Sequence, residues 1–221
     1  MKISKSKENY LKAIFHLQSV HKLVTTNELA SALRTTPASI TDMLKKLKKE
    51  RLLIYEPYRG FTLNSKGQKE ALQIIRKHRL WEYFLVKQLD FGWNEVHEMA
   101  EELEHASNKK LIDRLDSFLN YPRSDPHGDP IPDSEGKFNR QQKRIPLSKL
   151  GSNKRATVLA ISPQTSEILE LLQHKNILIG SQISIRKKFS FDDSLEIKMK
   201  NGKIVTISAS VAKNIMVNDG E

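Results

Sequence analysis

The stretch TTPASITDMLKKLKKERLLIYEPYRGFTLN, residues 35–64, decides the fold of the first part of the chain. Thr35 or Thr36 can cap a helix whose first turn accepts Pro37, and apolar residues then recur at helical spacing. Alternating apolar and polar residues on both sides of Pro57-Tyr58-Arg59-Gly60 predict a β-hairpin with Gly60 in its turn. A helix followed directly by a hairpin predicts the recognition helix and the wing of a winged helix-turn-helix.

Two helices are expected before this stretch. Residues 6–20 carry an apolar stripe at helical spacing. In VTTNELASAL, residues 24–33, Thr25 and Glu28 have the spacing of a capping box, which predicts a second, short helix. Because only a tight connection separates the second helix from the third, the pair has the spacing of a helix-turn-helix.

The exposed side of the third helix offers small polar groups near its start and lysines further on. Small polar groups can approach base edges, lysines can meet phosphates, and Arg59 at the hairpin tip suits a minor groove or a phosphate. The candidate DNA-binding residues are Thr36, Pro37, Ala38, Ser39, Thr41, Lys45, Lys46, Lys49 and Arg59. An ordinary solvated helix face can carry the same charge, so the prediction depends on the order of helix, helix-turn-helix and basic hairpin.

The net charge of +11 is concentrated at the front of the chain. Residues 1–66 hold 13 basic and 5 acidic residues, for a net charge of +8, whereas residues 67–144 carry −1 and residues 145–221 carry +4. This excess suggests an anionic polymer as partner. The chain has no cysteine, which excludes disulfides, thiolate zinc sites and cysteine nucleophiles. With no membrane-length apolar run and no signal-peptide hydrophobic region, we expect a cytoplasmic protein.

The acidic stretch HEMAEELEH, residues 97–105, offers metal ligands. At 100° per residue, its ligand-type side chains fall on one helical face: His97, Glu101, Glu104 and His105. His78 and Glu82 lie one turn apart on a preceding helix, so two helices would share a metal. Imidazole and carboxylate ligands without thiolate suit Mn(II), Fe(II), Zn(II) or Co(II). The ordinary alternative is a solvated acidic helix.

The rest of the chain divides into a helical middle, a connecting segment and a β-rich end. Helical patterns over 64–89, through His105 and over 108–119 leave surplus apolar surface, which suggests a symmetric dimer. Residues 121–143 are rich in Pro, Gly, Asp and Ser and are expected to be a linker or a long exposed loop. From residue 144 onward, alternating segments predict a small β domain with a helix over 165–174 and a tight turn at Asn201-Gly202.

These segments resemble the DtxR/MntR family of metal-dependent transcriptional repressors, and specifically its manganese-responsive branch. The resemblance is carried by ENYLKAIF, TPASITDMLKKL, LIYEPYRGFTLNSKG, KHRLWEYFL, ELEHAS and DPHGDPIP. It implies a mainly α fold with β: a winged-helix DNA-binding domain (1–66), a helical dimerisation and metal-binding domain (67–122), a linker (123–143) and an SH3-like domain of the FeoA type (144–221). It also implies a homodimer on double-stranded operator DNA.

The resemblance also implies two metal sites. The primary site would use Asn9, Glu101, Glu104 and His105, and the ancillary site would use His78, Glu82, His97, Gln164 and Glu167. Asp125 and His127 in DPHG are additional candidates, because some manganese members recruit ligands from this loop. Iron-responsive members have Cys in place of Glu101 and Met in place of Asn9. Oxygen ligands at both positions favour Mn(II), with Fe(II) as the alternative.

Two residues depart from the family pattern. Manganese members usually have Asp where this chain has Asn9, and some carry a compact two-metal site that needs Glu where this chain has Lys12. The positive charge of Lys12 argues against that two-metal arrangement and favours the ancillary site as the second site.

The expected mechanism is a population shift, in which metal ties the first helix to the dimerisation domain and fixes the spacing of the two winged helices. The metal-bound dimer is then expected to repress genes for metal uptake. A metallohydrolase is one alternative, although no additional acid, nucleophile or oxyanion motif accompanies the His and Glu residues. A winged-helix sensor of a small organic ligand is the other, and indifference of DNA binding to a chelator would favour it.

Overall fold

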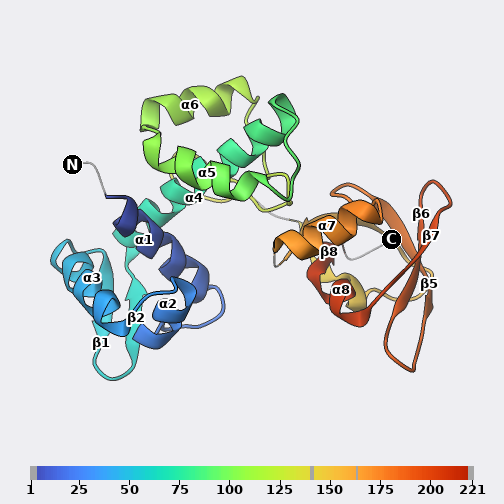
Figure 1. The fold of residues 1–221 in the computed structure, drawn as a ribbon, viewed down its shortest axis with the longest axis horizontal. Coiled ribbons are helices and arrows are strands. Elements are labelled where there is room, and N and C mark those ends of the chain that lie inside the picture. The colour runs from blue at the N-terminus through green and yellow to red at the C-terminus, as the bar shows by residue number, and fades with distance from the viewer. Residues whose placement is uncertain (1–3, 140–141, 163, 219–221) are drawn as a thin grey trace. The chain divides into compact units, whose positions relative to one another are not determined.

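The computed structural model describes residues 4–139, 142–162 and 164–218, and it contains two compact units (Figure 1). The first unit comprises the described residues of 1–80, 101–120 and 131–138, and the second comprises those of 81–100, 121–130 and 139–221. Helices with one hairpin make up most of the first unit, and the second unit is built around a six-stranded sheet. The predicted fold class, mainly α with β, is therefore confirmed. None of the described helices combines the length and the apolar character needed to cross a membrane.

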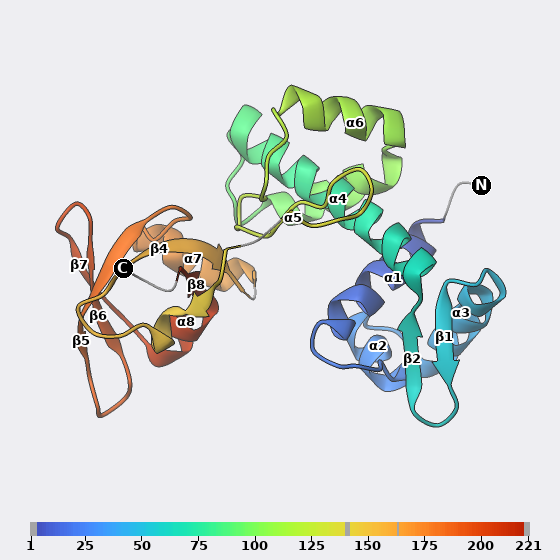
Figure 2. The ribbon, with the colours of Figure 1, turned by 180° about the vertical axis from the view of Figure 1, so that it is seen from behind.

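In the first unit three helices precede a hairpin, as the sequence predicts (Figure 2). They are α1 (Lys5–Gln18), α2 (Thr26–Ala32) and α3 (Pro37–Lys49), followed by β1 (Leu53–Glu56) and β2 (Gly60–Leu63). Thr25 and Glu28 form the predicted capping box of α2, and Thr36 caps α3 directly ahead of Pro37. The helix-turn-helix and its wing are thus in place.

Gly60 has a different role from the one predicted. It pairs with Glu56 in the β1–β2 ladder, so the connection of the hairpin is made by residues 57–59 and Gly60 lies in the strand. A Cβ atom at Gly60 would lie 2.5 Å from the carbonyl oxygen of Val24, and φ is +134°. Val24 and Phe61 exchange two backbone hydrogen bonds of 2.9 Å. Glycine is therefore required at position 60, because the backbone at Val24 lies too close to leave room for a Cβ atom.

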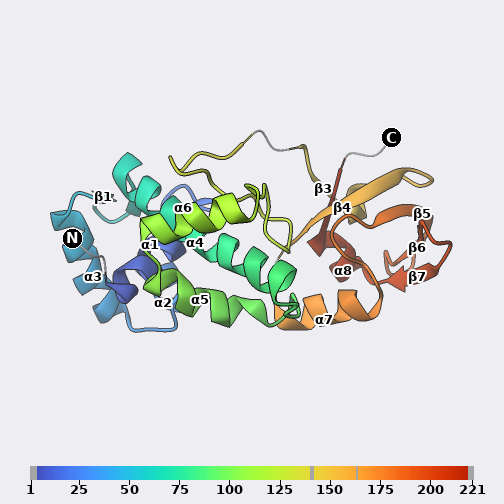
Figure 3. The same cartoon turned by 90° about the horizontal axis from the view of Figure 1, so that it is seen from above.

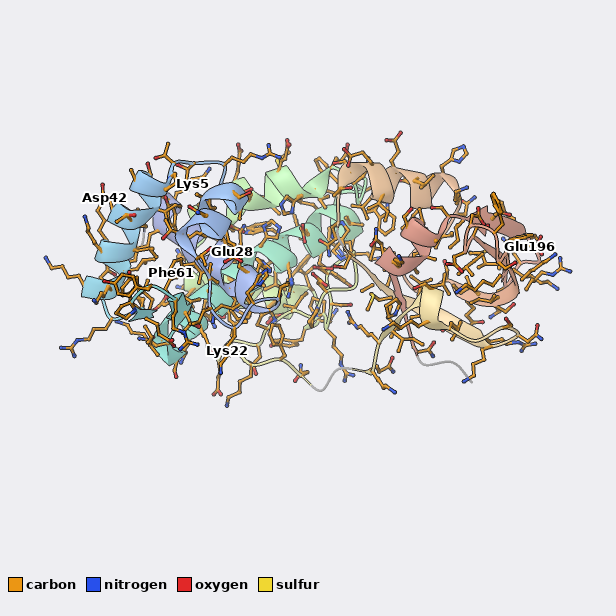
Figure 4. All side chains as sticks on the ribbon, turned by 90° about the horizontal axis from the view of Figure 1, so that it is seen from below. Lys5, Lys22, Glu28, Asp42, Phe61 and Glu196 are labelled. Atoms are coloured by element: carbon orange, nitrogen blue, oxygen red, sulfur yellow. The ribbon has the colours of Figure 1, made fainter. Side chains whose placement is uncertain are left out.

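The core of the winged-helix domain is formed by the inward sides of its three helices and its hairpin. Fully buried side chains come from all three of these helices and from β2: Leu11, Ile14, Leu29, Ile40, Leu47 and Phe61. Figure 4 labels Phe61 on β2. Each such side chain contributes about 1.5–3 kcal/mol on burial, so this core fixes α3 against the wing.

A buried arginine joins the long helix α4 (Ser65–Gln88) to α6 (Lys109–Phe118) within the first unit. Arg76 is 2% exposed. Its Nη1 lies 3.0 Å from Oδ1 of Asp113, and its Nη2 lies 2.7 Å from Oδ2 of Asp116. The Asp113 side chain is 42% exposed and that of Asp116 is 13% exposed. The charge of Arg76 is therefore compensated mainly by Asp116, because solvent screens the other pair.

The sequence predicts a linker or a long exposed loop over residues 121–143, and this prediction is wrong for the central part of the segment, which is buried. Asp125 is 4% exposed, His127 is 1% exposed and Ile131 is 5% exposed. One carboxylate oxygen of Asp125 accepts hydrogen bonds of 2.9 Å from the backbone N–H groups of His127 and Asp129. A Cβ atom at Gly128 would lie 1.9 Å from the carbonyl oxygen of Leu159, so the glycine lets this loop pack directly against β4.

The second unit contains an antiparallel sheet with the strand order β3-β8-β4-β5-β6-β7. Figure 3 labels β3, β4, β5, β6 and β7 of this sheet. Its strands are β3 (Ile145–Pro146), β4 (Arg155–Ile161), β5 (Gln182–Lys188), β6 (Leu195–Met199), β7 (Ile204–Ile207) and β8 (Ile215–Val217). Its helical elements are η1 (Leu147–Lys149), α7 (Ser166–His174) and α8 (Ala209–Asn214). The predicted helix near residue 165 and the turn at Asn201-Gly202 are both present.

The core of the second unit includes residues from outside the C-terminal segment. Trp93, which lies between α4 and α5 (Val96–Ala106), belongs to the same buried cluster as Val158, Leu172 and Ile197. Its indole Nε1–H donates a hydrogen bond of 3.1 Å to the side-chain oxygen of Gln173. The connection between α4 and α5 is therefore held against the C-terminal domain by an apolar contact and a polar one.

We predict that Asp116→Ala lowers the free energy of unfolding by about 3 kcal/mol, because it removes the main partner of a buried guanidinium. The matched variant Asp113→Ala should cost only about 1 kcal/mol, because that carboxylate is well solvated. Urea unfolding followed by circular dichroism measures both values. Equal losses for the two variants would contradict the account.

Candidate metal centre and nucleic-acid interface

Glu104 on α5 is the centre of the first group of candidate ligands. It is fully buried, with its Oε1 2.8 Å from Nζ of Lys12 and its Oε2 2.7 Å from Nδ1 of His78. Burial by itself raises the pKa of Glu104, but the His78 imidazole and the Lys12 ammonium outweigh it and hold that pKa below its usual value. The side chain is therefore a carboxylate at neutral pH.

His105 lies between Glu104 and a carboxylate that the sequence analysis did not select. Its Nδ1 lies 2.5 Å from Oε2 of Glu8 on α1, and its Nε2 lies 3.5 Å from Oε1 of Glu104. When Nδ1–H donates to Glu8, the neutral ring carries its lone pair on Nε2. Glu8 thus fixes the tautomer that leaves Nε2 as the ligand atom, as second-layer carboxylates do for metal-bound histidines.

Glu8 carried a weak signal in the sequence. It precedes the buried Leu11 by three residues and therefore adjoins the apolar face of α1, and it is 7% exposed. A carboxylate at such a position needs a partner. Besides His105, Glu8 has Lys77, whose Nζ lies 3.2 Å from Oε1.

Asn9 and Glu101 also approach each other, with Nδ2 of Asn9 3.4 Å from Oε1 of Glu101. Three buried atoms in this group have no hydrogen-bond partner among the described residues: Oδ1 of Asn9, Oε2 of Glu104 and Nε2 of His105. The His78 contact with Glu104 is short but lacks hydrogen-bond geometry. Two oxygens and one imidazole nitrogen are donors that a divalent cation accepts, so this group fits a metal.

A second group lies in the second unit. Glu82, Asp125 and His127 are all buried, and their ligand atoms lie within 4.8 Å of one another. Nε2 of His127 lies 2.7 Å from the carbonyl oxygen of Trp93, to which it can only donate. Nδ1 of His127 therefore carries the lone pair in the neutral ring. It lies 3.8 Å from Oε2 of Glu82, and no residue in the described ranges gives it a hydrogen bond. This group also fits a metal.

The remaining candidate ligands have different surroundings. The His97 side chain is 63% exposed, and its Nδ1 lies 3.2 Å from Oε1 of Glu82. His78 precedes Glu82 by one turn of α4. Gln164 precedes α7, and Glu167 lies exposed in its first turn, where the backbone N–H and Thr165 lower its pKa. Among the described histidine and carboxylate clusters, none contains Glu167.

The candidate DNA-binding residues gather on one exposed side of α3 and on the wing. Thr36, Pro37, Ala38, Ser39, Thr41, Lys45, Lys46 and Lys49 are all exposed, and so is Arg59. Lys45 pairs with the exposed Asp42 at 3.2 Å, and Arg59 pairs with Glu56 at 2.8 Å. Figure 4 labels Asp42 on α3. Exposed ion pairs of this kind are worth about 0–1 kcal/mol, so both cations remain available to phosphates.

Three family models match consecutive parts of the chain. Residues 2–61 match the iron dependent repressor N-terminal DNA binding domain, residues 64–133 match the iron dependent repressor metal binding and dimerisation domain, and residues 145–219 match the FeoA domain. The chain is 33% identical over 120 residues to the HTH-type transcriptional regulator MntR of Bacillus subtilis, which covers 54% of this chain and 84% of that protein. The chain belongs to the DtxR/MntR family of metal-dependent repressors. It is therefore a DNA-binding transcriptional regulator and not an enzyme, and the metallohydrolase alternative is wrong.

Other DtxR/MntR proteins resemble the chain over different lengths. The uncharacterised HTH-type transcriptional regulator MJ0568 of Methanocaldococcus jannaschii is 37% identical over 118 residues, which are 53% of this chain and 94% of that protein. A manganese-dependent transcriptional repressor in complex with manganese matches with a TM-score of 0.84 at 30% identity, over 96% of this chain and 99% of that one. ScaR with bound Cd2+ matches with a TM-score of 0.78, also at 30% identity, over 96% and 98%.

We predict that Glu8→Gln lowers the affinity for Mn(II) by about 10-fold or more, because the amide holds His105 less firmly and polarises it less. Equilibrium dialysis against Mn(II) measures the change. Glu70→Gln is the matched control, since Glu70 lines the same surface hollow as Glu8 and His105 but has no described contact with His105. An equal effect of both substitutions would contradict this role of Glu8, because it would show that the loss of one negative charge lowers the affinity whichever residue carries it.

Proposed function

We propose that the chain is a Mn(II)-activated repressor of metal uptake genes, acting as a homodimer on double-stranded operator DNA in the cytoplasm. The observation that carries this proposal is the donor set of the two buried groups, which consists of carboxylate, amide and imidazole atoms. Hard oxygen donors suit Mn(II), and the chain has no thiolate to favour a softer ion. The manganese-dependent repressor of similar structure supports the same metal. Fe(II) is the second candidate.

The first metal would be held by Asn9, Glu101, Glu104 and His105. The ammonium of Lys12, 2.8 Å from Glu104, supplies one positive charge at the position where some relatives need a Glu for a second metal. This supports one metal in this group and not two, because a second cation would repel the ammonium. Bound metal supplies positive charge that offsets the clustered carboxylates.

The second metal would be held by Glu82, Asp125 and His127, with His97 next to Glu82. The resemblance assigns His78, Gln164 and Glu167 to an ancillary site as well. The contacts support Glu82 as a member common to both ligand sets, because one of its oxygens approaches His97 and the other approaches His127. His78 approaches Glu104, so it suits a role that holds the first group in place.

The first group connects the DNA-binding domain with the helices that follow it. Its side chains come from α1, which packs in the winged-helix core, and from the last turns of α5. A cation shared by these helices fixes their relative position, whereas repulsion between unbridged carboxylates loosens it. We infer that metal shifts the population toward the arrangement that binds DNA.

The homodimer is supported by apolar side chains on the outside of α6. Leu111 is 45% exposed and Phe118 is 64% exposed, and at seven residues apart they lie on the same face of the helix. Exposed apolar residues grouped in this way favour association. A two-fold dimer would present two α3 helices to a palindromic operator.

The experiment that tests this function uses an operator duplex selected from random-sequence DNA by the Mn(II)-loaded protein. We predict that chelated protein binds it weakly and that Mn(II) restores binding at a lower concentration than Fe(II) does, under anaerobic conditions. Activation by Fe(II) alone would favour the iron alternative. Equal binding in chelator and in every metal would favour a sensor of a small organic ligand.

Substitution of Glu104 tests the first group in the same assay. Glu104→Ala should abolish the gain in DNA affinity that metal produces, because it removes the central carboxylate. The circular dichroism spectrum of the variant should remain that of a folded protein. Glu102→Ala is the matched control, since Glu102 is the exposed neighbour on the same helix. A full metal response of Glu104→Ala would exclude this group as the switch.

The lysines of α3 are tested by the salt dependence of DNA binding. Lys45→Gln combined with Lys46→Gln should weaken binding to all duplexes alike and reduce the slope of log K against log salt by about 2, since each phosphate contact contributes about 0.9. An unchanged slope would place the phosphate contacts on other residues.

A further inference from the structure

The open face of the C-terminal sheet carries two rows of polar side chains across β4, β5 and the end of β6. The strand register gives the first row as Arg155, Ser184 and Lys198. The second row begins with the paired residues Thr157 and Gln182, and it continues with Lys200, which directly follows β6 and donates a backbone hydrogen bond of 3.0 Å to the carbonyl oxygen of Gln182. Residues between them along the strands, such as Ala156, Ile183 and Met199, are buried in the core. Because side chains alternate between the two faces of a sheet, both rows face away from the core.

These rows line a surface hollow of about 620 Å³. Asn218 lies at its edge, where its side-chain oxygen accepts a hydrogen bond of 2.7 Å from the backbone N–H of Thr157. The polar groups in the hollow are a guanidinium, two ammonium groups, two hydroxyls and two amides. Within the part of the chain that the structure describes, no carboxylate lines the hollow.

The three cations of the hollow are not used within the fold. None of the ion pairs among the described residues includes Arg155, Lys198 or Lys200. The nearest acidic side chain along β6 is that of Glu196, labelled in Figure 4, and it lies 3.6 Å from Nη1 of Arg186. Three positive charges thus surround a polar floor without internal compensation, which attracts anions.

We propose that this hollow binds a small anion that carries at least two phosphate groups. Lys198 lies on β6 and Lys200 lies one residue beyond its end, so their backbones are separated by up to about 6.6 Å. Arg155 lies two strands away from Lys198, about 10 Å. A single phosphate is too small to engage cations around this whole perimeter. A diphosphate or triphosphate reaches Arg155 at one side and both lysines at the other.

The donors of the hollow suit phosphate oxygens in particular. The guanidinium of Arg155 presents paired N–H groups that match two oxygens of one phosphate, and the lysines add point charges. Ser184, Thr157 and the side-chain amides of Gln182 and Asn218 supply uncharged donors for the remaining oxygens. The volume lies in the range of small-molecule sites. The hollow shares no residue with either candidate metal group.

The test is isothermal titration of the full-length, metal-free protein with inorganic tripolyphosphate, diphosphate and monophosphate. We expect tripolyphosphate and diphosphate to bind at least 10-fold more tightly than monophosphate. Lys198→Gln combined with Lys200→Gln should weaken that binding at least 10-fold. The matched control is Lys149→Gln combined with Lys213→Gln, which removes two exposed lysines from η1 and α8 of the same domain. It should leave the binding unchanged.

Three outcomes overturn the proposal. An equal loss in the two double variants would mean that only net charge matters. Loss of tripolyphosphate binding in Lys45→Gln combined with Lys46→Gln, but not in Lys198→Gln combined with Lys200→Gln, would place the anion on α3. If the native protein binds no tripolyphosphate, and Lys198→Gln combined with Lys200→Gln loses affinity for duplex DNA, the face would bind DNA phosphates instead. Thermal unfolding of each variant excludes loss of the fold as the cause.

Discussion

The burial of a charged carboxylate at Glu104 is the constraint on which the first group depends. A buried carboxylate costs several kcal/mol unless cations or hydrogen bonds compensate it. Lys12 approaches one oxygen of Glu104 and His78 approaches the other, and His105 lies close by on the same helix. Since Lys12 belongs to α1, the DNA-binding domain itself supplies part of the compensation. We infer that a metal added at this place would change how firmly α1 is held and would thereby couple metal binding to DNA binding.

The second group, Glu82, Asp125 and His127, also buries carboxylates, but it is held in place by different parts of the chain. His127 is held by the carbonyl oxygen of Trp93, and its ring stacks on the Trp93 ring with centroids 6.0 Å apart. Trp93 in turn packs in the C-terminal core. The loop that carries Asp125 and His127 is thereby attached to a rigid sheet, which is a requirement for a site that must hold its ligands in one geometry. We propose that a metal ion adds to the compensation of the buried carboxylates in this group as well.

Local chemistry explains why much of the fold could be predicted from sequence. The capping box of Thr25 and Glu28, and Pro37 after its capping threonine, act within one helical turn, so their pattern is sufficient. Burial of the 121–143 segment could not be predicted in this way, because its Gly128 packs against β4, a strand distant in sequence. Glu8 was missed for the same reason, since only the packing of α1 against α5 gives it His105 as a partner. The 100° spacing of residues along a helix predicts which side chains share a face, but it does not predict which other elements pack against that face.

We propose that the chain holds two separate metals, each in a group of buried oxygen and imidazole donors. The most direct measurement is the Mn(II) content per chain at saturation, determined by elemental analysis after equilibrium dialysis. The account predicts about two ions for the native chain and about one each for Glu104→Gln and Asp125→Asn, because each substitution removes a carboxylate from a different group. A native chain that binds one ion, or an Asp125→Asn variant that keeps the full complement, would contradict it.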